Sequence, residues 1–189
     1  MVTTDRAACR VPLIAPEDAA DAAVRAVYAE IERELGFGIV PNVFRALAGQ
    51  PAVLRAVWDL FRATMLEGDL PRVVKEMVAV VVSAANDSRY ALAVHLHSLD
   101  VQGVAAGALA ALAGGDAVVP GVAPGTGALL RLARVAVRDG ARAVTDADLA
   151  AAAAAGVGPE ELAEAFAVID LFRYLNGFTD LARVPIDAL

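Results

Sequence analysis

Residues 70–99 read LPRVVKEMVAVVVSAANDSRYALAVHLHSL, and this stretch decides the fold. Pro71 is suited to the first turn of a helix, where a missing N–H costs nothing. From Met77 to Ala85 the sequence is uncharged and rich in valine, which predicts a helix that is buried on nearly all sides. Asn86-Asp87-Ser88 then supplies three cap-forming residues, so a second helix is predicted to begin there. Two packed helices therefore form the centre of the predicted fold.

This helix pair brings a carboxylate and an imidazole towards one seam. Glu76 lies just before the valine run, and a buried carboxylate needs a proton or a cationic partner. Four residues of the second helix share one face by their spacing of i, i+3, i+4 and i+7: Ser88, Ala91, Leu92 and His95. If Glu76 pairs with His95, the two can act as acid and base near neutral pH. A structural hydrogen bond between them, or an ion pair of Glu76 with Arg72 or Arg89, is the alternative.

The spacing of these residues resembles the AhpD / carboxymuconolactone decarboxylase superfamily. In its redox members a Glu is followed by Cys-x-x-Cys-x-x-x-His, and here that register holds Glu76, Ser88, Ala91 and His95, so both cysteines are replaced. The resemblance runs from Val11 to Asp187. Three further segments are similar to the "peroxidase-related" branch: VPNVFRAL (40–47), LPRVVKEMVAVVVSAAN (70–86) and FRYLNGFTDLARVPID (172–187).

The expected fold class is all-α, because no run of the sequence alternates with a period of two over a useful length. The resemblance implies an AhpD-like helical bundle that assembles as a trimer or hexamer. We expect one domain over 1–189, and its helices can be divided into two similar halves. Its parts are an N-terminal arm (1–15), a first helical half with the central helix pair (16–113), a Gly/Pro-rich connection (114–127) and a second helical half (128–189).

Composition excludes several classes of protein. Hydrophobic residues make up 58% of the chain but aromatic residues only 5%, and the net charge is −7 with scattered arginines, so nucleic-acid binding is not expected. No uncharged run reaches the roughly 20 residues that a membrane span needs, and no secretory signal is visible. We therefore predict a cytoplasmic protein. Its Ala/Val-rich helices have more apolar surface than a monomer readily hides, which favours a homo-oligomer.

Other polar side chains near the seam have a functional and a structural interpretation. Ser88 occupies the place of a thiolate in the redox relatives, but an N-cap role explains it without catalysis. Tyr90 can donate a hydrogen bond into the seam or simply pack there. His97 points away from His95, because residues two apart on a helix diverge, so no metal site is predicted. No cofactor motif is present, and the single cysteine, Cys9, lies in the N-terminal arm without an internal partner.

Three functions remain open. The first is a thiol peroxidase, which needs a nucleophilic and a resolving thiol that the sequence lacks at the required places. The second is non-redox acid–base chemistry, of a decarboxylase, isomerase or lyase type, on a small organic substrate with Glu76 and His95 as the reacting pair. Four neighbours would then shape the pocket: Tyr90, Met77, Val81 and Leu92. The third is an oligomeric binding or structural protein that has lost catalysis.

Overall fold

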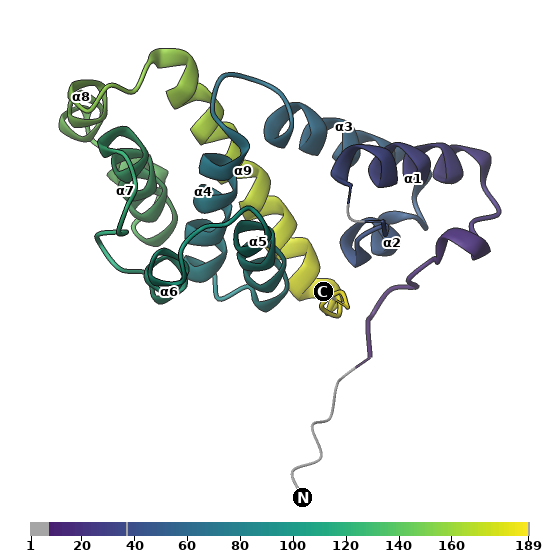
Figure 1. Ribbon diagram of the computed structural model, residues 1–189. Helices are drawn as coiled ribbons and strands as arrows, with labels where there is room; N and C mark the ends of the chain where they lie inside the picture. Colours follow the sequence, from purple (N-terminus) through teal and green to yellow (C-terminus); the bar gives the residue numbers. More distant parts are fainter. Residues whose placement is uncertain (1–7, 37, 189) are drawn as a thin grey trace, which may run out of the picture.

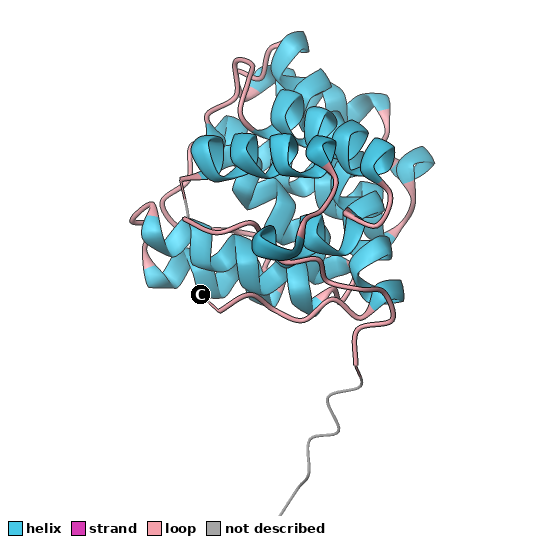
Figure 2. Ribbon diagram, turned by 90° about the vertical axis from the view of Figure 1, so that its right-hand side faces the viewer, coloured by secondary structure: helices cyan, strands magenta, loops and turns pink. Residues whose placement is uncertain are grey.

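The structure is a computed structural model that describes residues 8–36 and 38–188. All regular elements within these ranges are helices, which confirms the predicted all-α class, and Figure 2 shows them joined by loops. Nine are α-helices: α1 (Ala22–Leu35), α2 (Asn42–Leu47), α3 (Pro51–Met65), α4 (Arg72–Ala85), α5 (Arg89–Val101), α6 (Ala106–Gly114), α7 (Pro124–Arg138), α8 (Asp146–Ala154) and α9 (Pro159–Ala182). Two short 3-10 turns complete them: Pro16–Asp18 and Ala141–Ala143.

Helix α4 is the centre of the molecule, as its valine run predicts. It packs against α5, α6, α7 and α9, so that all its residues from Val74 to Ser83 are buried. Short connections join α4 to its neighbours in sequence, α3 and α5 (Figure 1). No residue of α4 is exposed, and its small β-branched side chains let several neighbours approach it closely.

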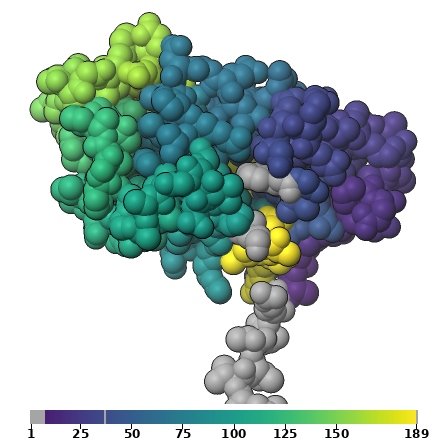
Figure 3. All heavy atoms as spheres, viewed as in Figure 1, coloured from purple at the N-terminus to yellow at the C-terminus, as the bar shows by residue number. Residues whose placement is uncertain are grey.

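Helices α1–α3 form a layer on one side of this centre, and α6–α8 lie on the other side (Figures 1 and 3). Three aromatic rings of the first layer form a cluster. The rings of Phe44 and Trp58 meet edge to face with centroids 5.6 Å apart, and Phe44 meets Phe61 in the same way at 5.6 Å. This cluster closes one side of the space between α3 and α9.

The described part of the N-terminal arm is held against the body of the protein. The backbone N–H of Arg10 donates to the carbonyl of Ala182 over 2.8 Å, and the N–H of Ile14 donates to the carbonyl of Arg45 over 3.2 Å. The Cys9 thiol also donates to the carbonyl of Ala182, over 3.3 Å. Residues 1–7 of the predicted arm lie outside the described residues.

The Gly/Pro-rich connection is shorter than its predicted bounds of 114–127, because α7 already begins at Pro124. Proline is favoured at that first helical position, and the following Gly125 lies close to the backbone of Ala155, where a Cβ atom would be 3.2 Å from the carbonyl oxygen. The division of the domain into two similar halves stays a prediction. Among the described helices, none combines the length and the apolar character that crossing a membrane requires.

A buried ion pair ties α4 to α9. Lys75 has only 1% of its side chain exposed, and its ammonium group lies 2.8 Å from Oε2 of Glu164. It also donates to the backbone oxygen of Glu67. The Glu164 carboxylate accepts from the backbone N–H groups of Asp69 and Leu70, at 2.6 and 3.1 Å. The turn that leads into α4 is therefore fixed from the side of α9.

Candidate active site

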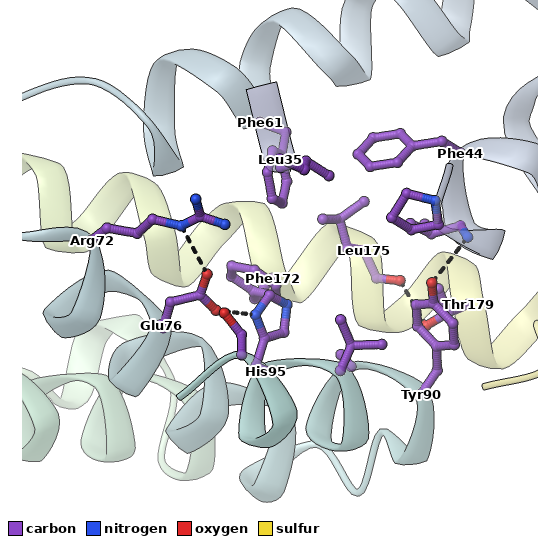
Figure 4. Close-up of a pocket in the computed structure, with 15 residues that line it drawn as sticks. Leu35, Phe44, Phe61, Arg72, Glu76, Tyr90, His95, Phe172, Leu175 and Thr179 are labelled. Atoms are coloured by element: carbon purple, nitrogen blue, oxygen red, sulfur yellow. Dashed lines mark hydrogen bonds and ion pairs between the residues drawn. The ribbon is translucent and has the colours of Figure 1, made fainter. Parts of the chain in front are cut away.

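A cavity of about 50 Å³ lies where the α1–α3 layer meets α4, α5 and α9 (Figure 4). Most of its wall is apolar: Leu35, Pro41, Val43, Phe44, Phe61, Ala91, Val94, Phe172 and Leu175. The polar residues that reach it are Arg72, Glu76, Tyr90, His95, Ser98 and Thr179. A cavity of this volume can hold a few water molecules or one small molecule.

Glu76 and His95 face each other at the edge of this cavity. Oε2 of Glu76 on α4 lies 2.5 Å from Nδ1 of His95 on α5. The exposed fractions of the two side chains are 2% and 10%. Both alternatives for the partner of Glu76 are realised at once, because Nε of Arg72 lies 3.4 Å from the other oxygen, Oε1. Arg89 forms no ion pair with Glu76 in the part of the chain that the structure describes.

Ser98 adds a third donor to Glu76, and sequence reasoning missed it. The side-chain amide of Gln102 donates to Oγ of Ser98 over 3.2 Å, which leaves the hydroxyl hydrogen of Ser98 for the Glu76 carboxylate. Ser98 follows His95 by three residues, so the shared face of the helix was the signal that could have found it. Burial alone raises the pKa of Glu76, but His95, Arg72 and Ser98 together lower it below its usual range. Glu76 is therefore an ionised carboxylate.

The charge of Glu76 determines which nitrogen of the His95 ring carries the hydrogen. Because Nδ1 faces a carboxylate, that nitrogen carries the hydrogen, and the neutral ring has its lone pair at Nε2. Figure 4 shows the second ring nitrogen turned away from Glu76 and towards Leu175. Within the described residues Nε2 has no hydrogen-bond partner. Phe172 packs against the ring edge to face, with centroids 4.5 Å apart. The site thus presents one unsatisfied acceptor nitrogen to an apolar cavity.

Tyr90 reaches the cavity wall, but its hydroxyl is already fully used. It donates to Oδ2 of Asp187 over 2.7 Å and accepts from the N–H of Val43 over 3.1 Å. The other oxygen of Asp187 accepts from the N–H of Asn42 over 2.8 Å. Burial, together with the charge of Asp187, raises the pKa of Tyr90 well above its usual value. Tyr90 is a protonated link between the segment after α9 and the start of α2.

Ser88 is at the N-cap position of α5, as predicted, but its side chain does not cap the helix. The hydroxyl instead donates to Oδ1 of Asp180 on α9 over 3.1 Å. The residue is completely buried and does not line the cavity. Burial raises the pKa of Asp180, and the neighbouring charge of Asp87 raises it further. The structure therefore does not bring Ser88 to Glu76 and His95, whereas Ala91 does lie on the cavity wall.

The predicted apolar wall was wrong. Met77, Val81 and Leu92 do not line the cavity. Met77 directly follows Glu76, and consecutive residues of a helix are rotated by about 100° from each other, so it points elsewhere. The wall is built by Phe44, Phe61 and Phe172 instead, which come from three other helices. His97 also lies away from the cavity. Residues 8–36 and 38–188 contain no group of three or more His, Cys, Asp or Glu side chains that could hold a metal ion.

Comparisons with known proteins bear on the family and the fold of the chain. The model of the carboxymuconolactone decarboxylase family matches residues 51–134, which include Glu76 and His95. An alkyl hydroperoxide reductase of Mycobacterium tuberculosis is 38% identical over 115 residues, or 57% of the chain. The chain spans about a third of the length of this curated relative, since the match covers 33% of it.

The fold is similar to that of solved structures over nearly its whole length. An uncharacterised peroxidase-related protein of Ralstonia eutropha with an AhpD core is 25% identical, with a TM-score of 0.84 over 95% of this chain and 93% of that one. A cysteine-to-alanine variant of a debrominase, in complex with 2,3,4-tribromopyrrole, is 20% identical, with a TM-score of 0.78 over 96% of this chain and 95% of that one. The predicted AhpD-like bundle is thereby confirmed as the fold.

Proposed function

Because the chain belongs to the AhpD-like, carboxymuconolactone decarboxylase superfamily, we propose that it carries out non-redox acid–base chemistry on a small organic molecule. The observation that carries the proposal is the pair Glu76–His95, with Nε2 of His95 open to an apolar cavity. A base in such a place can take a proton only from a bound molecule or from water that enters with it.

The two residues have different roles in this proposal. Nε2 of His95 removes a proton from the substrate, and the imidazolium that forms is stabilised by the ionised Glu76. The same nitrogen then returns the proton to another atom of the substrate, as a decarboxylation or an isomerisation requires. Glu76 does not exchange the proton itself, because three donors hold it as a carboxylate. It orients His95 and selects the tautomer.

The cavity suggests the kind of substrate. Arg72 balances the charge of Glu76, and the remaining wall is largely apolar and aromatic, so a small molecule with an apolar body and one weakly acidic hydrogen fits best. The debrominase relative binds a brominated pyrrole, a small ring, which supports including rings among the candidates.

A binding function without turnover is the second candidate. The small volume of the cavity favours it, since about 50 Å³ leaves little room for a substrate to rearrange. Thiol peroxidase chemistry is not proposed. The resemblance places Ser88 and Ala91 where the redox relatives have their two cysteines, and the single cysteine of the chain, Cys9, does not line the cavity.

Proton transfer can be tested before the complete reaction is known. Candidate molecules (keto acids, lactones, phenols and azoles) are incubated with the protein in D₂O, and NMR records the exchange of their C–H hydrogens. We expect exchange of at least one candidate, reduced about 10²–10⁴-fold by His95→Gln and also reduced by Glu76→Gln. His97→Gln is the matched control, because His97 is on the same helix but outside the cavity. If a candidate binds saturably but the wild type exchanges its C–H hydrogens no faster than His95→Gln does, the catalytic proposal is refuted and the binding function takes its place.

Assembly as a homo-oligomer, a trimer or hexamer, is part of the proposal. Its support is the exposure of large apolar side chains: Tyr174 is 44% exposed and Leu181 73% exposed, both on α9. Light scattering on the full chain measures the mass directly, and a monomer at micromolar concentration would contradict this part.

A further inference from the structure

Helix α7 carries a row of arginines that nothing in the helix neutralises. Arg131, Arg134 and Arg138 follow at i, i+3 and i+7 and therefore share one face. The helix contains no acidic residue from Pro124 to Arg138, although the whole chain has 23 Asp and Glu against 16 Lys and Arg. The three arginines have different neighbours. The charge of Arg131 acts on Asp148 of α8 and contributes to lowering the pKa of that carboxyl.

The other two arginines line a groove of about 280 Å³. The groove lies beside α4, on the side where α6 and α7 each pack against that helix. Helices α1–α3 lie on the opposite side of α4 (Figure 1). It shares no lining residue with that cavity. The groove is hollow because its remaining lining residues are small: Val81, Ala84, Ala85, Ala113, Gly114 and Gly115.

The guanidinium groups at this groove have more donors than partners. A guanidinium has five N–H donors. Arg134 donates one hydrogen bond, to the backbone oxygen of Asp116 over 2.5 Å. Within the described residues neither Arg134 nor Arg138 forms an ion pair. Burial lowers the pKa of Arg134, and the positive charge of Arg138 lowers it further, while the Asp116 carboxylate acts in the other direction. Two positive charges and one negative charge leave the groove with a net positive charge.

Two carbonyl groups near the end of α6 are already paired with backbone N–H groups. The N–H of Gly115 donates to the carbonyl of Leu112 over 3.2 Å, and the N–H of Asp116 donates to that of Ala111 over 2.9 Å. The last turn of α6 is thus closed on itself, and the arginines are left facing the groove. An acceptor with negative charge is what this arrangement lacks.

We propose that this groove is a binding site for a small molecule with an oxyanion group, either a carboxylate or a phosphate, held between Arg134 and Arg138. Arginine pairs suit such groups because the planar fork of donors matches two oxygens at once. The small side chains of the floor leave room for the rest of the molecule. The site is independent of the chemistry at His95.

The test measures thermal unfolding of the full-length protein in inorganic phosphate and in malonate, each against sodium chloride at the same ionic strength. We expect a saturable rise in Tm with at least one of the two anions that chloride does not give. Arg138→Gln and Arg134→Gln should each weaken the apparent affinity at least tenfold. Arg131→Gln is the matched control and should change it less than twofold, because it is the same residue type on the same helix face.

A second variant separates the groove from the general effect of charge. Ala85→Leu keeps both arginines but fills the groove, so it should abolish the response. Arg138 is exposed, and its variant is expected to fold even if Arg134→Gln does not. A response to phosphate alone identifies a phosphate compound as the ligand, and one to malonate alone identifies a carboxylate. An equal rise of Tm in chloride, or an equal loss of affinity in Arg131→Gln, overturns the proposal.

Discussion

Glu164→Gln should destabilise the protein by about 3–5 kcal/mol at pH 7, which is the usual effect of leaving one charge of an ion pair buried without its partner. The charge left behind is that of Lys75, since Glu164 itself is 22% exposed. This value lies at the upper end of the destabilisation that single substitutions usually cause, and the structure gives the reason. Lys75 is 1% exposed, so its ammonium group would stay buried with the backbone oxygen of Glu67 as its remaining acceptor. The substitution also weakens the acceptor for the N–H groups of Asp69 and Leu70. Total stabilities are about 5–15 kcal/mol, so this loss is large.

The dependence on pH gives a second check of the same reasoning. Burial alone raises the pKa of Glu164, but its bonds with Lys75, Asp69 and Leu70 lower it below its ordinary value of 4.5. A carboxyl with a lowered folded-state pKa stabilises the fold above its unfolded-state pKa, and this contribution is lost as the pH falls through the folded-state pKa. The difference between Glu164→Gln and the wild type should therefore be full at pH 7 and shrink below about pH 4.

Urea unfolding followed by the fluorescence of Trp58, the single tryptophan, measures the free energy of unfolding. Asp170→Asn is the control on the same helix. Asp170 also pairs with an arginine, Arg173, but its side chain is 77% exposed, so the expected change is below about 1 kcal/mol. If Glu164→Gln costs no more than Asp170→Asn, or if its effect is the same well below pH 4 as at pH 7, the ion pair of Lys75 and Glu164 does not hold α4 to α9.

Two further substitutions test the polar contacts around the cavity. Asp180→Asn should raise the Tm at pH 7 and have no effect near pH 3. Because the pKa of Asp180 is raised, the folded state favours the protonated form and loses stability as the pH rises above 3.8. Thermal unfolding across this pH range measures the effect, and a less stable asparagine variant at pH 7 would contradict the reasoning. Tyr90→Phe should cost about 1–3 kcal/mol in urea unfolding, because it leaves Oδ2 of Asp187 without a donor and the N–H of Val43 without an acceptor. An unchanged free energy of unfolding would show that water replaces the hydroxyl.

The sequence predicted the helices, and it offered a contact between Glu76 and His95 as one of several interpretations, because both depend on local spacing. The run from Met77 to Ala85 predicted a helix that is buried on nearly all sides, and the structure buries it from Met77 to Ser83. Glu76 and His95 were found because each lies at a distinctive position of its own helix. Ser98 was within reach of the same argument, since it lies one turn after His95 on the same face.

The cavity wall could not be predicted because it depends on which helices become neighbours. Helical spacing shows which residues share a face, but it does not show what that face meets. Phe44, Phe61 and Phe172 are ordinary core residues of their own helices in the sequence, and only the packing of α2, α3 and α9 brings them to His95. The bond between Ser88 and Asp180 was missed for the same reason, because 92 residues separate its two ends.

The contact between Asp187 and Asn42 also has a consequence for the order of folding. These residues are 145 positions apart, and Tyr90 and Asp187 are 97 apart. Contacts this distant in sequence form late, since a long loop must close before they contribute. Helices α4 and α5 can pair early, but the start of α2 is held in place only when the last residues arrive. We therefore expect the wall of the cavity to be the last part of the protein to assemble, and its amide hydrogens to be among the first to exchange with solvent.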